Sequence, residues 1–141
     1  MAICLTVASC GSGESYLVNS NYKFKKPYKK KGIKVRLTTY WASGRGSDKW
    51  TRKKQSSTGK MLISGRSAAV DPKIIPYGSK IFIPSANKTV EAVDTGSAVI
   101  KRTASKKSNN GEPVVDLFFD HKCQAMNFVK NNPEVTVVFI Q

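Results

Sequence analysis

The feature that most constrains the fold is a series of six short strand-like runs, each bounded by turn-forming residues. The clearest run is IKVRLTTYW (33–41), in which side chains suited to a buried face alternate with polar ones at a period of two. Gly, Pro, Ser and Asn residues between the runs are typical of turns. The other runs lie at 61–70, 80–84, 88–94, 114–119 and 134–140. Together the six runs predict a small, mostly-β barrel.

One late segment has the spacing of a helix instead. In HKCQAMNFVKN (121–131), Cys123, Met126 and Val129 recur at every third position. This spacing predicts a short amphipathic helix with these three side chains on its apolar face. Pro133 follows and would end the helix. We therefore expect a mostly-β barrel with one short late helix.

Two polar segments interrupt the folded part, which we place at residues 33–141. Residues 42–60 are polar and contain glycine, which predicts a long loop of the kind that is usually functional or mobile in a compact domain. Residues 103–113 are basic and rich in Asn and Gly, which predicts an exposed insertion.

Residues 1–32 have the composition of a leader followed by a basic linker. Residues 2–8 form a short, largely apolar run, and Val7-Ala8-Ser9-Cys10 fits the pattern that precedes a lipid-modified cysteine in bacterial lipoproteins. We expect export to the bacterial cell envelope, in the periplasm or on the outer surface, with Cys10 as the candidate lipoprotein membrane tether. The alternative interpretation is a frayed N-terminus.

The charge balance restricts the partners of the chain. Among 141 residues, 24 Lys and Arg against 9 Asp and Glu give a net charge of +15. Such a surface attracts polyanions, which include nucleic acid, acidic lipid and an anionic cell wall. The excess is densest in NYKFKKPYKKKGIK (21–34), where mutual repulsion predicts a solvated, poorly ordered arm.

Metal and cysteine chemistry are not indicated. His121 is the single histidine, and the three cysteines form no CxxC pair, so no group of residues has the spacing of zinc ligands. We expect no metal and no cofactor. Cys123 stands near apolar residues and is predicted to be a small buried side chain instead of a nucleophile.

Asp116 stands inside a strand-like run, VVDLFF (114–119). A lone carboxylate among apolar side chains is costly unless it is paired, hydrogen-bonded or protonated, and neither a turn nor a helix cap explains it. Loss of solvation should raise its pKa, and a second carboxylate nearby would raise it further. Enzymes use this arrangement to keep an acid protonated near neutral pH, ready to protonate a leaving oxygen. Cleavage of a glycosidic bond needs such an acid.

Three further aspartates stand beside strand-like or helical sequence. Asp71 precedes a proline and is predicted to cap its turn. Asp94, in the sequence DTG, can accept backbone N–H bonds within its turn or serve a functional site, and both interpretations stay open. Asp120 directly precedes the helical segment and is predicted to be its N-cap.

Five segments of the folded part match one known family in the right order. They are TTYW (38–41), STGK (57–60), AAVDPKIIPYGSKIFIP (68–84), VEAVDTGSAVI (90–100) and VVDLFF (114–119). Together they resemble the 3D domain, which is named for three aspartates and is related to the catalytic barrel of the MltA-type lytic transglycosylases. The resemblance covers residues 34–140 and implies a six-stranded double-psi β-barrel. It also implies cleavage of the β-1,4 bond between N-acetylmuramic acid and N-acetylglucosamine in peptidoglycan, with a 1,6-anhydro product.

The resemblance also implies roles for individual residues. The three aspartates fall on Asp71, Asp94 and Asp116, and Asp116 corresponds to the acid/base, which protonates the glycosidic oxygen and then accepts a proton from the sugar's own 6-hydroxyl as that attacks C1. Asp94 would tune Asp116 by charge and hydrogen bonding, and Asp71 would support the loops. Tyr40 would stack on a sugar ring. Further substrate contacts are expected from the backbone N–H groups of Thr95, Gly96 and Ser97.

Two segments depart from the family pattern, and both bear on the substrate. The family has a short run between its second and third aspartates, whereas this chain has DTGSAVIKR followed by the basic segment 103–113. The loop at 42–58 is the second departure. The expected partner is the peptidoglycan glycan strand, to which a cationic surface is attracted at low salt.

Three alternatives to a lytic transglycosylase remain. The first is a non-catalytic wall-binding or expansin-like wall-loosening module, which would show no bond cleavage that depends on Asp116. The second is a nucleic-acid-binding protein, suggested by charge alone; an exported chain with an acidic triad argues against it, and we expect no nucleic acid. The third is a hydrolase that uses water and leaves reducing ends.

Overall fold

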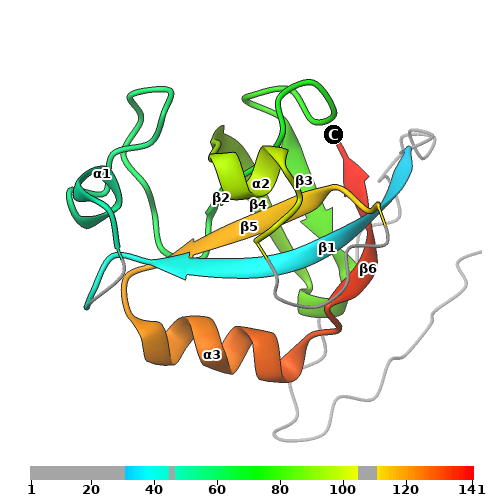
Figure 1. Cartoon of the computed structure of the whole chain (residues 1–141). Coiled ribbons are helices and arrows are strands. Elements are labelled where there is room, and N and C mark those ends of the chain that lie inside the picture. The colour runs from blue at the N-terminus through cyan, green and yellow to red at the C-terminus, as the bar shows by residue number, and fades with distance from the viewer. Residues whose placement is uncertain (1–30, 45–46, 105–110) are drawn as a thin grey trace, which may run out of the picture.

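The computed structural model describes residues 31–44, 47–104 and 111–141 (Figure 1). The expected leader, the Cys10 tether and the basic arm up to residue 30 lie outside the described residues, as does most of the expected insertion. The strands are β1 (Gly32–Trp41), β2 (Ser67–Ala69), β3 (Lys80–Ile83), β4 (Lys88–Asp94), β5 (Val114–Phe119) and β6 (Val135–Ile140). The helical elements are α1 (Lys49–Arg52), the 3-10 turn η1 (Pro84–Ala86), α2 (Ser97–Ile100) and α3 (Lys122–Asn131).

The six strands close into a barrel in the order β1-β5-β2-β4-β3-β6. Two of the pairings are parallel, β1 with β5 and β2 with β4, and the other four are antiparallel. Parallel neighbours require crossover connections, so the chain passes across the barrel between them. The fold class predicted from the sequence, a mostly-β six-stranded double-psi barrel with one short late helix, is confirmed.

The barrel interior is filled by one side of each strand. Val35 and Leu37 of β1 lie in this core with Val115, Leu117 and Phe119 of β5. Because successive side chains of a strand point to opposite faces, the alternate residues of β5 point outward. The outward side is also covered, so β5 is largely buried on both faces, and its residues other than Asp116 are apolar.

Two small apolar clusters cover the outer face of β5. One contains Phe118 with Leu62 and Val93, and the other contains Val114 with Ala69 and Val99 of α2. Asp116 lies between Val114 and Phe118 on this same outer face, so it stands in the gap between the two clusters.

Helix α3 forms where the sequence predicted it, but the predicted apolar face is wrong. Ala125 and Phe128 are the buried side chains, whereas Cys123, Met126 and Val129 are exposed. The Phe128 ring packs against the ring of Phe119 with centroids 5.6 Å apart. The small Ala125 lets the helix approach the barrel one turn earlier. The packing of the Phe128 ring on the core therefore determines which face of α3 is buried. The face that carries Cys123, Met126 and Val129 stays exposed.

The predicted role of Asp120 is also wrong. His121 is the N-cap of α3, and its backbone N–H donates to Oε1 of Gln124 at 3.1 Å. The Asp120 carboxylate instead pairs with Nζ of Lys54 at 2.8 Å. This pairing partner comes from the segment after α1, 66 positions away, which local sequence cannot indicate.

Two short helices form where only loops were predicted. Within 42–60, Asp48 caps α1 by accepting hydrogen bonds at Oδ1 from the backbone N–H groups of Trp50 and Thr51, both at 2.8 Å. After DTG, residues 97–100 form α2. Figure 1 shows α1 at the end of a loop beyond β1, while α3 runs along a different side of the barrel. In the described part of the chain, no helix has the length and apolar character needed to span a membrane.

Candidate active site

Four neighbouring strands place four residues in one row. Thr38 of β1 is paired with Asp116 of β5, Asp116 with Ala69 of β2, and Ala69 with Asp94 of β4. Side chains at paired positions point to the same face of a sheet. Two of the three predicted aspartates therefore come together on the outer face of the barrel, with only the methyl group of Ala69 between them.

A break in strand register brings Asp94 into this row. Ala68 is paired with Ala92, but the next residue, Ala69, is paired with Asp94, so one residue of β4 is skipped. Ala92 lies in the barrel core, and strict alternation would turn Asp94 toward the core as well. Such bulges re-aim side chains and are frequent beside active sites. Here the bulge allows Asp94 to point outward, toward Tyr40 and Asp116.

Asp116 has the environment of a carboxyl group that binds its proton more tightly than usual. Thr38 Oγ1 donates a hydrogen bond of 2.6 Å to Asp116 Oδ1, and part of the side chain remains accessible to solvent. Burial raises the pKa of Asp116 to about 6; the Thr38 hydrogen bond opposes this shift, and the charge of Asp94 adds to it. The direction agrees with the expectation from the sequence.

Asp94 is held by donors on both carboxylate oxygens. The Tyr40 hydroxyl donates to Oδ2 at 2.8 Å, and the backbone N–H of Ser57 donates to Oδ1 at 2.8 Å. Thr58 fixes the same loop by donating from Oγ1 to the carbonyl of Val93 at 2.7 Å. The carboxylate is therefore buried and rigidly oriented, with 8% of Asp94 exposed.

Tyr40 contacts both Asp94 and Phe118 and so helps to hold Asp94 in place. Its ring packs edge-on against Phe118, with centroids 5.3 Å apart. Burial, and then the adjacent Asp94 carboxylate, raise the pKa of Tyr40, so its hydroxyl stays protonated and donates to Asp94. The expected stacking of Tyr40 on a sugar ring stays a prediction. In the structure, the Tyr40 hydroxyl donates to Asp94 and its ring packs against Phe118.

Asp71 lies in a turn, as predicted. Its Oδ1 accepts from the Lys73 backbone N–H at 3.0 Å, and its carbonyl accepts from the N–H groups of Ile74 and Ile75. Among the described residues, no hydrogen bond or ion pair joins Asp71 to Asp94 or Asp116. Asp71 lies two residues after Ala69, the last residue of β2. It therefore shapes the loop that follows the strand between Asp116 and Asp94.

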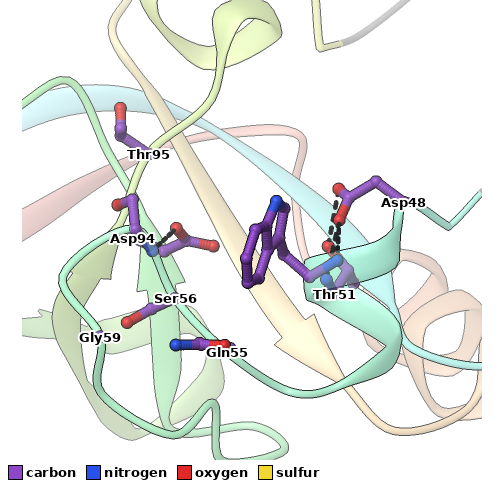
Figure 2. A pocket seen from close by; sticks show the side chains of 9 residues that line it. Asp48, Thr51, Gln55, Ser56, Gly59, Asp94 and Thr95 are labelled. Carbon is purple, nitrogen blue, oxygen red and sulfur yellow. Dashed lines mark hydrogen bonds between the residues drawn. The ribbon is translucent and has the colours of Figure 1, made fainter.

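A groove of about 440 Å³ adjoins Asp94. Figure 2 shows Asp48 and Thr51 on one side of it, with Asp94, Ser56 and Thr95 on the other. The groove is lined by Asp48, Trp50, Thr51, Gln55, Ser56, Ser57, Gly59, Asp94 and Thr95.

One of the three predicted substrate contacts lines this groove. Thr95 belongs to its lining, while Gly96 and Ser97 follow Thr95 in the chain and form the start of α2. The Thr95 hydroxyl oxygen is buried and has no hydrogen-bond partner among the residues described. Thr38, Ser57 and Trp50 were not predicted as site residues, because no sequence pattern places them near the aspartates. The helical turn at residues 49–52 did have a local signal, which is the N-cap formed by Asp48.

The described residues contain no group of three or more His, Cys, Asp or Glu side chains arranged to hold a metal ion. What the site offers is a carboxyl group with a raised pKa, a fixed carboxylate nearby, hydroxyl donors and an adjoining groove. This set can protonate a leaving oxygen and then remove a proton from a nucleophile.

Comparison with known proteins identifies the family. A family model described as 3D domain matches residues 66–140, just over half of the chain. The match includes all three aspartates, whereas β1 and α1, which supply Thr38, Tyr40 and Trp50, lie before it. No curated protein matches the chain. The chain therefore belongs to the 3D domain family.

Proposed function

We propose that this protein is a peptidoglycan lytic transglycosylase that cleaves the β-1,4 bond between N-acetylmuramic acid and N-acetylglucosamine and leaves a 1,6-anhydro product. The observation that carries the proposal is the Asp116 carboxyl, whose pKa is raised to about 6 in a row with the Asp94 carboxylate. The family is one of cell-wall domains related to lytic transglycosylases, which supports this substrate class.

The reaction needs one group that acts twice. Protonated Asp116 donates its proton to the glycosidic oxygen, and the bond from that oxygen to C1 of the muramic acid breaks. Ionised Asp116 then takes the proton of the same sugar's 6-hydroxyl, whose oxygen forms the new bond to C1. A pKa near 6 suits both steps at a pH close to neutral.

The surroundings of Asp94 favour this route over hydrolysis. An inverting hydrolase needs a second carboxylate to activate water, and a retaining one needs it as a nucleophile. Both oxygens of Asp94 already accept hydrogen bonds, from Tyr40 and from Ser57. We assign Asp94 the role of holding charge near Asp116, Asp71 the role of supporting the site's loops, and Thr95, Gly96 and Ser97 the role of contacting the glycan.

The proposed setting is the bacterial cell envelope. Peptidoglycan carries stem-peptide carboxylates, and a chain with a net charge of +15 is attracted to such a polymer. Export and a membrane tether at Cys10 belong to this proposal and are tested by the cellular location of the tagged full-length chain.

Digestion of purified peptidoglycan tests the activity. Wild-type protein should release soluble fragments that end in 1,6-anhydro sugar, as identified by mass spectrometry, and Asp116→Asn should release none. Asp120→Asn is the matched control, because the Asp120 carboxylate pairs with Lys54 and is not part of the row that contains Asp116 and Asp94, so it should be dispensable for cleavage.

The outcomes separate the alternatives. Reducing ends in place of anhydro ends would establish a hydrolase. Absence of fragments, with sedimentation onto the wall retained, would overturn the enzyme proposal and leave a wall-binding module. Equal cleavage by wild type and Asp116→Asn would overturn the assignment of the acid.

A further inference from the structure

We propose that the groove beside Asp94 is a glycan-binding subsite with Trp50 of α1 as its stacking wall. The inference rests on the proposed function, because that function brings a glycan to the adjacent carboxylates. It adds a binding residue outside the stretch that the family model matches.

Trp50 is exposed where it would normally be covered. Of its surface, 58% is accessible to solvent, although tryptophan is on average among the well-buried residue types. The Asp48 cap fixes the backbone of the turn that carries Trp50. Nζ of Lys49 lies 5.7 Å from the centre of the indole ring, which is a cation-π distance. The structure thus presents an exposed aromatic surface to the groove.

The rest of the groove is polar, which selects the class of ligand. Gln55, Ser57 and Thr95 line it together with the Asp94 side chain. An aromatic surface combined with polar groups suits a pyranose, whose ring face is apolar and whose edge carries hydroxyl groups.

The size of the groove agrees with this ligand. A volume of about 440 Å³ is within the range of sites that hold small ligands. Tyr40 cannot easily serve as the platform instead, because its hydroxyl is bound to Asp94 and its ring packs on Phe118.

Chitotetraose is the first probe, because it contains only N-acetylglucosamine and offers no muramic acid bond to cleave. The chain has two tryptophans, Trp41 and Trp50. In Trp41→Phe, Trp50 is the remaining tryptophan. Titration with chitotetraose should change the tryptophan emission in a saturable way. By isothermal calorimetry, Trp50→Ala should bind about tenfold more weakly than wild type or worse, and Trp50→Phe should retain part of the affinity.

Met61→Ala provides a matched control, because Met61 is 74% exposed and does not line the groove. It should bind as wild type does. A second probe, solubilised uncleaved peptidoglycan strands, is titrated into Asp116→Asn so that no cleavage takes place. Trp50→Ala in that background should weaken binding by a similar factor. In cleavage assays with intact Asp116, Trp50→Ala should raise KM much more than it lowers kcat.

The outcomes distinguish this inference from the proposed function. Unchanged binding in Trp50→Ala, or a wild type that binds neither probe, overturns the subsite, even where cleavage that depends on Asp116 persists. Binding that depends on Trp50 without any release of fragments supports the subsite and overturns the enzyme proposal.

Discussion

At the scale of single residues, the raised pKa of Asp116 carries a cost in stability. Its pKa rises from an ordinary value near 3.8 to about 6 on folding, so the folded chain binds the proton more tightly than the unfolded chain does. Between these two pKa values the folded state holds more protons, and stability therefore falls as pH rises. Above pH 6 the ionised carboxylate costs about 3 kcal/mol of folding free energy, by the usual conversion of a pKa shift.

Asp116→Asn should therefore stabilise the protein at high pH and not at low pH. We expect its free energy of unfolding to exceed that of wild type by about 1–3 kcal/mol at pH 8 and to match it near pH 4, because Asn carries no charge to desolvate. Urea unfolding at pH 4, 6 and 8 measures this difference. A constant difference across these pH values would contradict the raised pKa.

Thr38 is the residue that limits this shift. Its hydroxyl stabilises the ionised form of Asp116, and Thr38→Val keeps the shape of the side chain while removing the donor. The pKa of Asp116 should then rise, and the pH above which kcat/KM falls should move upward from about 6. The pH profile of fragment release measures the midpoint. An unmoved midpoint would show that a different group limits the rate.

At the scale of elements, α3 and β4 both differ from what their own sequence indicates. The face of α3 is chosen by Phe128 against Phe119, a residue of β5, and the orientation of Asp94 is chosen by the bulge where β4 meets β2. In each case a contact with another element outweighs the periodic pattern. The turn at Asp71 and the capped turn α1, by contrast, follow local signals, because each is held by hydrogen bonds to a nearby aspartate.

Two alanine substitutions on α3 test which face is buried. Phe128→Ala should cost about 3–5 kcal/mol of unfolding free energy, because Phe128 is 9% exposed and fills the space beside Phe119. Met126→Ala should cost roughly 0.5 kcal/mol or less, because Met126 is 43% exposed. Chemical denaturation of both variants measures the difference. Equal losses would contradict the observed face.

At the scale of the whole molecule, barrel closure assembles the site from distant parts of the chain. Thr38 and Asp116 are 78 positions apart, and Tyr40 and Asp94 are 54 apart. The net charge of +15 acts at this scale too, because it comes from many residues, most densely placed at 21–34, and does not depend on any one contact. Long-range attraction of this kind is screened by salt.

Binding to the cell wall should therefore weaken with ionic strength. We expect sedimentation of Asp116→Asn with purified peptidoglycan to fall between about 50 and 500 mM salt, as the screening length shortens from over 10 Å to under 5 Å. Chitin is the control, because it is a neutral glycan, and its binding should change little. Binding to peptidoglycan that is insensitive to salt would assign recognition to uncharged contacts alone.

The fold class and the principal carboxylate could be predicted from the sequence, because both depend on local patterns. Short strand-like runs separated by turn residues indicate a mostly-β fold. Asp116 among valines and phenylalanines indicates a desolvated carboxyl group, which raises its pKa, and Asp71 before a proline indicates a turn. The family match rests on motifs that can be read in the same way.

Tertiary structure alone decided how these parts meet. The row from Thr38 to Asp94 depends on strand register and on one skipped residue, and a shift of a single position would turn a side chain to the other face. The pairing of Asp120 with Lys54, the buried face of α3 and the place of Trp50 beside Asp94 likewise arise from contacts between segments far apart in the chain. Periodicity carries no information about such contacts, because their energies depend on which distant side chains the closed barrel brings together.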